Sequence, residues 1–274
     1  MREIIAIVNG VEQDPAAPAV GPLDPGLLGH GVYESIRTYG GVPFAVADHL
    51  DRLRDGATAL AIACPYAELA RDVARAAALR EGDGETRIRA NLTAGGVRIV
   101  VADALPDRRR DRDEGLAVSI LPWARDPAAP TAGVKASSTA ASRVAQRHCA
   151  DHGTATGVWV TPAGHVSEAI AANVFVVVDG ELVTPPLSDG ALAGVTRGKL
   201  LAFARDAGIA TAERSFTVAQ LAAADEAILS ATSEPVVPLV QVDGVVIADG
   251  RRGPVTRRLQ SLFDERARAL TRPA

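Results

Sequence analysis

The sequence contains almost no lysine. Of its 29 lysine and arginine residues, only Lys135 and Lys199 are lysine. Arginine therefore supplies positive charge in general, and a retained lysine raises the question of whether that position needs a primary amine. A guanidinium stays protonated and does not readily form an imine, whereas a lysine amine can lose its proton and form one. Composition alone leaves open whether either lysine has such a role.

Other absences narrow the class of protein. The net charge is −4, so there is no basic surplus to attract nucleic acid or anionic lipid. The apolar run at residues 4–8 is too short for a signal peptide or a membrane span, and we expect a cytoplasmic protein. Cys64 and Cys149 lie far apart in segments with a helical pattern, and the five histidines lack ligand spacing. These patterns predict reduced thiols and no metal site.

Hydrophobic periodicity predicts alternating strands and helices over a chain long enough for two modest domains. Strands are expected at residues 4–8, 32–39, 86–93, 98–102, 116–121, 157–161, 174–178, 181–184, 227–230 and 239–246. Helices are expected at residues 48–62, 66–79, about 137–152, 196–207 and 254–270. This order is typical of an α/β protein.

Two segments interrupt this pattern. Residues 105–115 carry charges of both signs without periodicity, which predicts a solvated surface loop. Proline and glycine in residues 126–133 mark a linker. We therefore expect an N-terminal domain over residues 1–121, a linker over 122–133 and a C-terminal domain over 134–274.

Lys135 and Glu168 form the first candidate pair. The chain between them contains a predicted helix, a strand and a turn, a path that can bring both residues to one pocket. A pyridoxal cofactor needs a lysine amine to hold its aldehyde as an imine and a carboxylate beside its pyridine nitrogen. The alternative interpretation of Glu168 is a surface carboxylate that follows a turn.

A candidate phosphate site precedes the helix predicted at 196–207. Residues 192–197 read Leu-Ala-Gly-Val-Thr-Arg, and the N–H groups at a helix N-terminus, with the Thr196 hydroxyl, suit an anion. A plain threonine N-cap is the alternative. The Ser-Ala-Thr-Ser segment at 230–233 could add hydroxyl donors. Arg52 could add a fixed charge, although arginines of amphipathic helices are commonly only solvated.

The order of these motifs resembles the class IV, or fold-type IV, aminotransferase family, which includes branched-chain aminotransferases, D-amino-acid aminotransferases and aminodeoxychorismate lyase. The matching segments are residues 9–10, 29–37, 49–53, 134–135, 166–175, 184–185, 192–197, 242–244 and 253–254. The resemblance implies a two-domain α/β (α+β) fold, with an N-terminal α/β domain and a C-terminal α/β pseudobarrel domain. It also implies a homodimer, with the active site between the domains and against the second subunit.

The resemblance assigns roles to individual residues. It implies pyridoxal 5'-phosphate as the cofactor, Lys135 as the catalytic lysine and proton carrier, and Glu168 as the partner of the pyridine nitrogen. The further cofactor contacts that it implies are Arg52, Val195, Thr196 and Thr232. The implied contacts to the amino donor and the 2-oxo acid acceptor are Tyr33, Ser35, Arg37, Arg89 and Ser233. Strand alternation also puts Tyr33, Ser35 and Arg37 on one face, while Arg89 has a strand-surface arginine as its alternative interpretation.

Departures from the family pattern leave the reaction open. Branched-chain members carry a tyrosine five residues after the lysine, where this chain has Ala140, which argues against a branched-chain enzyme. Residues 168–173 and 235–238 look closest to the lyase. We expect an aminotransferase acting on a small amino acid or amine, with aminodeoxychorismate lyase and then a non-catalytic relative as alternatives. His30 stands where the family commonly has aspartate.

Overall fold

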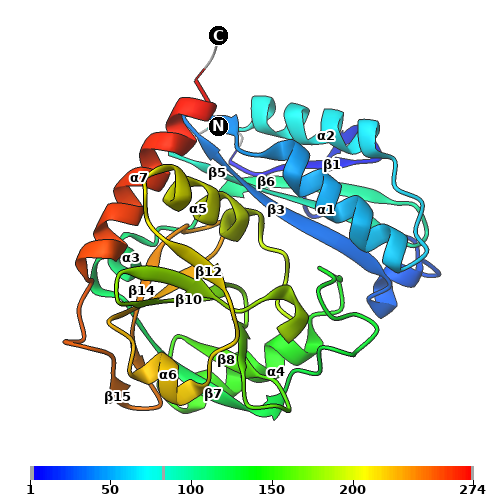
Figure 1. Cartoon of the computed structure of the whole chain (residues 1–274). Coiled ribbons are helices and arrows are strands. Elements are labelled where there is room, and N and C mark those ends of the chain that lie inside the picture. Colours follow the sequence, from blue (N-terminus) through cyan, green and yellow to red (C-terminus); the bar gives the residue numbers. More distant parts are fainter. Residues whose placement is uncertain (1–2, 82–83, 273–274) are drawn as a thin grey trace. The chain divides into compact units, whose positions relative to one another are not determined.

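The computed structural model describes residues 3–81 and 84–272, and its contacts divide the chain into two compact units (Figure 1). Unit 1 contains the chain up to Pro106, the segment Val134–Thr139 and the residues from Ala267 onward. Unit 2 contains Asp107–Gly133 and Ala140–Arg266. These bounds differ from those of the two domains expected from the sequence, which remain a prediction.

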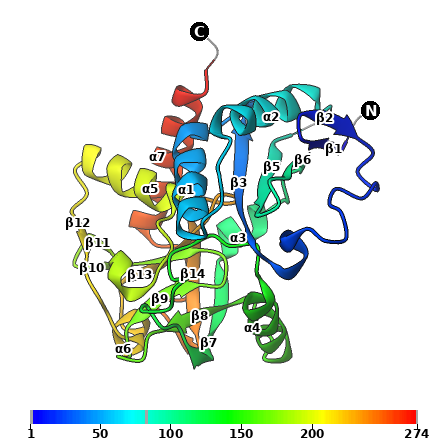
Figure 2. The same cartoon turned by 90° about the vertical axis from the view of Figure 1, so that its right-hand side faces the viewer.

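Unit 1 is built on a six-stranded antiparallel sheet in the order β2-β1-β6-β5-β3-β4. Its strands are β1 (Ile5–Val8), β2 (Val11–Gln13), β3 (Gly31–Tyr39), β4 (Val42–Pro43), β5 (Thr86–Thr93) and β6 (Arg98–Ala104). The helices are the 3-10 turn η1 (Pro25–Leu28), α1 (Val46–Ala59) and α2 (Tyr66–Leu79). The short hairpin β1–β2 continues the sheet beyond β6 (Figure 2).

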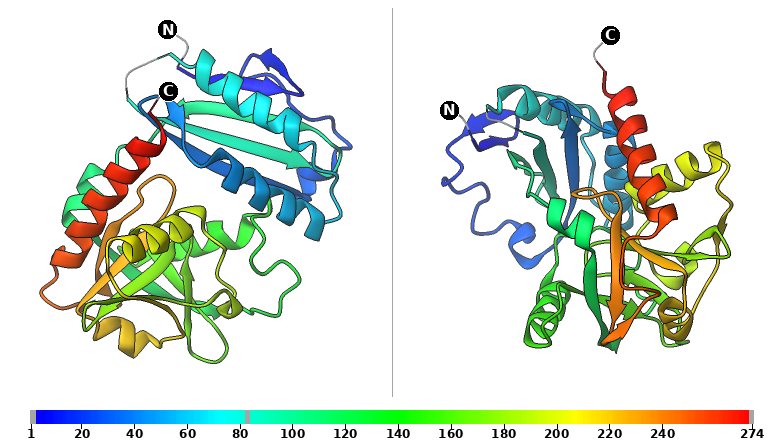
Figure 3. Two further views of the ribbon diagram at one scale, coloured as in Figure 1. Left: turned by 45° about the horizontal axis from the view of Figure 1, so that its top comes forward. Right: turned by 90° about the vertical axis from the view of Figure 1, so that its left-hand side faces the viewer.

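The two faces of this sheet differ. Helices α1 and α2 cover one face of the sheet (Figure 3). Apolar residues of α1, α2, β3 and β5, such as Leu50, Leu69, Ile36 and Ile88, form the core there. Along β3, residues at even positions are buried and those at 33, 35 and 37 are half-buried. Side chains of a strand alternate between faces, so Tyr33, Ser35 and Arg37 share the face opposite the core, as expected.

Unit 2 contains a nine-stranded mixed sheet in the order β12-β11-β10-β13-β14-β7-β8-β9, with β15 paired to β14. Its strands are β7 (Leu116–Ala124), β8 (Thr156–Val160), β9 (Val166–Ala169), β10 (Asn173–Val178), β11 (Glu181–Thr184), β12 (Thr211–Glu213), β13 (Glu226–Ser230), β14 (Val237–Val242) and β15 (Val245–Val246). The helices are α3 (Arg109–Glu114), α4 (Ala140–Asp151), the 3-10 turn η2 (Leu187–Asp189), α5 (Val195–Asp206), α6 (Val218–Ala222) and α7 (Pro254–Leu270), whose residues from Ala267 onward are counted with unit 1. Parallel strands β7 and β14 run side by side in it (Figure 3).

Several expectations were wrong in detail. Residues 109–114 of the expected surface loop form α3, because Arg112 bonds to Glu234 and Asp264, partners that a local pattern does not reveal. The strand expected at 239–246 breaks into β14 and β15 at a turn where Asp243 has a φ of 45°. Cys64 precedes α2 instead of lying in a helix, and both cysteines are free thiols.

Two further observations concern the described residues as a whole. Across residues 3–81 and 84–272, no helix is both long enough and apolar enough to cross a membrane. Within the same ranges, histidine, cysteine, aspartate and glutamate side chains form no cluster of three or more that could hold a metal ion.

Candidate active site

Lys135 is fixed to unit 1 by its backbone. The Tyr33 N–H donates to the Lys135 carbonyl at 3.1 Å, and the Ser137 N–H donates to the Gly31 carbonyl at 2.8 Å. These bonds add the segment around Ala136 to β3 as an antiparallel bridge. The Lys135 Nζ lies 4.4 Å from the centroid of the Tyr33 ring. The amine therefore stands beside a residue of the polar β3 face, in a cation–π contact.

A buried cluster in unit 1 holds Arg52. Its Nε and Nη2 donate to the two carboxylate oxygens of Glu34, each at 2.7 Å, and His49 Nδ1 lies 2.8 Å from Glu34 Oε2. Glu34 and His49 are both buried. Burial acts to raise the pKa of Glu34, but the hydrogen bonds from His49 and Arg52 outweigh it and lower that pKa to about 2. Glu34 is therefore ionised at neutral pH and can only accept, so His49 Nδ1 carries the proton.

The cluster was not predicted, although the sequence holds a signal for it. Glu34 occupies the core side of an alternating strand, where a carboxylate needs partners. His49 and Arg52 lie three residues apart, on one face of the helix that follows. Burial also lowers the pKa of His49, against the raising effect of Glu34, so His49 is neutral at pH 7. Arg52, predicted to contact phosphate, is thus a cation held by its own carboxylate partner.

The polar face of unit 1 carries further charge. Strand register pairs Ser35 with Arg89, and Arg37 with Arg87. Asp103 on β6 accepts from Arg87 Nε at 2.9 Å and Nη2 at 2.6 Å, and from Arg89 Nη2 at 3.2 Å. Arg89 therefore lies beside Ser35 on the neighbouring strand. Arg87 and Asp103, which had not been singled out, belong to the same face.

Glu168 is held firmly in unit 2. It is buried in β9, so it is not the surface carboxylate of the alternative interpretation. Its Oε2 accepts the Leu192 N–H at 2.8 Å, and its Oε1 lies 2.8 Å from Arg125 Nη2. Arg125 Nε also donates to the Gly190 carbonyl at 3.0 Å. Arg125 follows β7 directly, and no local pattern distinguishes it from a surface arginine.

Helix α5 begins at the predicted phosphate turn. Gly194 is its N-cap, and Thr196 lies in the first turn, so the interpretation of Thr196 as the N-cap is wrong. The first N–H groups of a helix have no intrahelical acceptor and attract anions. A Cβ at Gly194 would overlap Asn173 Oδ1, so the turn requires glycine. Asn173 Nδ2 fixes the approach to the turn by donating to the Leu192 carbonyl at 2.9 Å.

Thr232 and Ser233 lie at the neighbouring strand end. Strand β13 ends at Ser230, which pairs in register with Asn173, so Asn173 brings this end to the α5 turn. The Ser230 Oγ is buried and has no hydrogen-bond partner among the residues that the structure describes. An unpartnered buried hydroxyl beside open helix N–H groups fits an anionic ligand such as phosphate.

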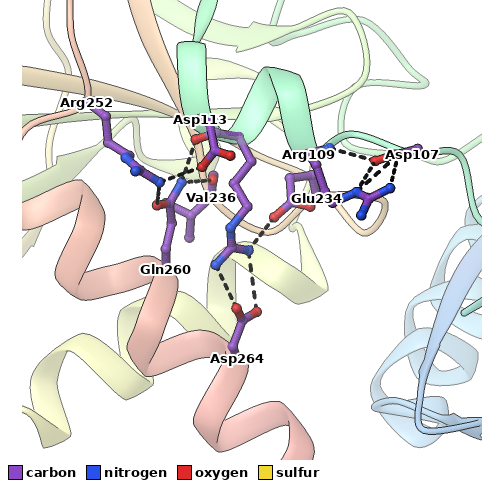
Figure 4. Close-up of polar contacts among 9 residues, drawn as sticks. Asp107, Arg109, Asp113, Glu234, Val236, Arg252, Gln260 and Asp264 are labelled. Carbon is purple, nitrogen blue, oxygen red and sulfur yellow. Dashed lines mark hydrogen bonds and ion pairs between the residues drawn. The ribbon is translucent and has the colours of Figure 1, made fainter. Parts of the chain in front are cut away.

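Side chains of α3 and α7 hold the turn that follows β13 (Figure 4). Arg112 Nη1 donates to Glu234 Oε1 at 2.7 Å, and Arg112 Nη2 donates to Asp264 Oδ2 at 2.6 Å. Gln260 Nε2 donates to the carbonyls of Arg112 and Val236 at 2.9 and 3.0 Å. Helix α3, which the sequence analysis did not predict, therefore holds the segment that carries Thr232 and Ser233.

A model of the family described as amino-transferase class IV matches residues 31–242, more than half of the chain. The chain belongs to the class IV aminotransferase family. Class IV aminotransferases use pyridoxal 5'-phosphate, so this member is a pyridoxal-phosphate-dependent enzyme. The match extends from the start of β3 to the end of β14 and includes Lys135, Glu168 and the α5 turn.

Relatives of this class IV aminotransferase carry two kinds of name. The branched-chain-amino-acid aminotransferase of Escherichia coli K12 is 30% identical over 257 residues, which cover 86% of this chain and 83% of the relative. The D-alanine aminotransferase of Listeria monocytogenes EGD-e is 28% identical over 258 residues, which cover 87% of each. The crystal structure of a branched-chain aminotransferase from Thermoproteus uzoniensis has a TM-score of 0.89 and 26% identity, and it covers 97% of this chain and 95% of its own.

These relatives revise the expected alternatives. All of them are named as aminotransferases, so aminodeoxychorismate lyase is not favoured for this class IV member. Branched-chain enzymes are among the relatives even though this chain has Ala140 in place of their usual tyrosine. The other departure has a structural role, because His30 Nε2 hydrogen-bonds the Leu60 carbonyl at 3.0 Å, at the end of α1.

Proposed function

We propose that this aminotransferase exchanges an amino group between a small amino acid or amine and a 2-oxo acid, with Lys135 as its catalytic residue. The observation that carries the proposal is the position of the Lys135 amine, 4.4 Å from the Tyr33 ring on the polar face of β3. Names of relatives support small substrates, since they include branched-chain and D-alanine aminotransferases.

The cofactor-binding residues fit pyridoxal phosphate. When bound, this group supplies an aldehyde that captures amines and a ring that withdraws electrons from the substrate carbon. We assign the phosphate to Arg52, the Val195 and Thr196 backbone N–H groups, and the hydroxyls of Thr196 and Thr232. The glycine cradle at 194 and the unpartnered Ser230 hydroxyl support an anion there. Glu168 accepts the pyridine N–H.

Lys135 has two tasks in this proposal. Its amine would hold the aldehyde group of the bound cofactor. When neutral, Lys135 Nζ would act as the base that removes a proton from the substrate carbon, and the protonated amine would later act as the acid that gives the proton back. Tyr33, Ser35, Arg37, Arg89 and Ser233 orient the substrate for this transfer by contacting its carboxylate and side chain.

The proposal also covers assembly and location. We propose a cytoplasmic homodimer, the state that the family resemblance implies. Light scattering coupled to size exclusion measures the mass of the particle directly, and a single-chain mass would contradict the dimer.

Absorbance of the bound cofactor tests the function. We expect the wild-type protein to show the absorbance of an imine-bound pyridoxal group, and Lys135→Ala to lose it. Lys199→Ala is the matched control, because Lys199 is the only other lysine, and it should retain the band. A panel of D- and L-amino acids, aromatic amines and aminodeoxychorismate then identifies the donor by conversion to the pyridoxamine form. Retention of the band in Lys135→Ala, or inertness to the whole panel, would contradict the proposal.

A further inference from the structure

Two arginines on the polar face of unit 1 share one carboxylate. Strand β5 contributes the guanidinium groups of Arg87 and Arg89, and β6 contributes Asp103. These three side chains therefore carry a surplus of one positive charge. Every amino acid brings one carboxylate, so a face with this surplus raises the question of whether it also accepts a second.

The two arginines that bind Asp103 are held differently. Arg87 donates twice, and a bidentate arginine–carboxylate pair is strong and fixed in geometry. Arg89 donates once, at 3.2 Å, and its side chain is 43% exposed, against 30% for Arg87. A single contact of a partly exposed arginine is weak. Arg89 is therefore the partner that can leave Asp103 at little cost.

Arg89 is also within reach of a small substrate at Lys135. Ser35 lies two residues beyond Tyr33 on β3, and Arg89 pairs with Ser35 on the next strand. Strand geometry places the Arg89 Cα about 8 Å from the Tyr33 Cα, from a rise of roughly 3.4 Å per residue and a strand spacing of about 4.8 Å. The Lys135 amine lies beside the Tyr33 ring. A side chain as long as arginine can reach the far end of a five-carbon substrate across such a distance, once it has left Asp103.

We propose that Asp103 determines which substrate side chains this aminotransferase accepts. It holds Arg89 while a neutral side chain is bound, and it yields Arg89 to the second carboxylate of an acidic amino acid or its 2-oxo acid. This inference rests on the proposed function, because it takes the polar face of β3 as the substrate face. Asp103 is thus a specificity-determining residue that acts through Arg89.

The physical basis is competition between two carboxylates for one guanidinium. With a neutral side chain bound, Arg89 needs a counter-charge in a less hydrated pocket, and Asp103 supplies it. With an acidic side chain bound, the ligand offers charge-assisted hydrogen bonds of the same kind. Asp103 stays beside the ligand through Arg87 and repels its second carboxylate. Removal of the Asp103 charge should therefore favour acidic ligands over neutral ones.

Binding of two unreactive acids to the loaded enzyme tests the proposal. Glutarate and 4-methylpentanoate have the same chain length and one carboxylate in common, but only glutarate carries a second. Neither has an amino or oxo group, so calorimetry measures binding without turnover. In Asp103→Asn we expect glutarate to bind about fivefold more tightly than in the wild type, the size of effect expected when a partly exposed ion pair is removed. Binding of 4-methylpentanoate should stay unchanged or weaken.

A double-mutant cycle assigns the effect to Arg89. Arg89→Gln should weaken glutarate binding more than 4-methylpentanoate binding, and the gain from Asp103→Asn should vanish in the Arg89→Gln background. Asp151→Asn is the matched control, because it breaks an exposed aspartate–arginine pair with Arg147 on α4. It should change neither affinity.

Several results would overturn the inference. An unchanged affinity ratio in Asp103→Asn, weaker glutarate binding in that variant, or a gain that persists without Arg89 would each do so. Thermal unfolding confirms that each variant is folded. Failure of the proposed function is distinguishable, because it appears as a wild type without cofactor absorbance or without reaction towards amino acids. A wild type that reacts normally while Asp103→Asn keeps its selectivity refutes the inference alone.

Discussion

Arg125 Nη2 lies 2.8 Å from Glu168 Oε1, and the same guanidinium donates through Nε to the Gly190 carbonyl. The other carboxylate oxygen of Glu168 accepts the Leu192 N–H. Each carboxylate oxygen has two lone pairs, so the proposed pyridine N–H shares an oxygen with one of these donors. Arg125 thereby joins the carboxylate to the loop that leads into the α5 turn.

Arg125→Gln should weaken cofactor binding about tenfold, because Glu168 loses a charge-assisted hydrogen bond and the loop loses an anchor. The rate of cofactor release from the purified protein, followed by absorbance, measures this effect. Arg125→Lys should restore part of the affinity. Arg147→Gln, which removes an exposed arginine of α4, provides the control and should leave release unchanged. Equal release rates for Arg125→Gln and the wild type would remove Arg125 from the site.

Gly194 offers a second test, with its own control in the same helix. Gly194→Ala places a Cβ against Asn173 Oδ1 and should destabilise the fold by about 1–3 kcal/mol, as overpacking commonly does. It should also weaken cofactor binding, since the turn must shift. A Cβ at Gly198, inside α5, meets nothing described within 4 Å, so Gly198→Ala should stabilise the protein by up to about 1 kcal/mol. Urea unfolding with and without cofactor measures the stability of each variant and its binding of the cofactor. Equal behaviour of the two variants would contradict the requirement for glycine at position 194.

The low pKa of Glu34 predicts that the free energy of unfolding decreases at acidic pH. Its pKa falls from 4.5 to about 2 in the folded chain, so its stabilising contribution is complete above pH 4.5 and is lost as the pH falls towards about 2. The shift corresponds to a contribution on the order of 3 kcal/mol. Glu34→Gln should lower stability at pH 7 by about 3 kcal/mol, because it leaves the Arg52 charge without its carboxylate.

The Glu34→Gln variant should also lose part of the acid sensitivity. Between pH 4.5 and about 2, its free energy of unfolding should decline less steeply than that of the wild type. Glu68→Gln, in an exposed pair with Arg71 on α2, should follow the wild-type profile. Equal pH dependence of the free energy of unfolding in Glu34→Gln and the wild type would show that His49 and Arg52 do not lower the pKa of Glu34.

The sequence was sufficient where the determinants are local. Periodicity predicts α2, β5 and α7 with their observed bounds, since each buries one stripe or face of its own residues. It fails for α3, whose Arg112 finds its partners more than a hundred residues further along the chain. Arg125 and Asp103 escaped notice for a similar reason, because only pairing between strands or loops gives them a role.

The bridge between Lys135 and β3 has a consequence for motion. The Tyr33 N–H donates to the Lys135 carbonyl, so an isolated antiparallel bridge ties the lysine backbone to β3. The freedom left to this half-buried residue is rotation about the bonds of its side chain. The proton transfer that we propose for Nζ would then need a change of rotamer and no rearrangement of the main chain.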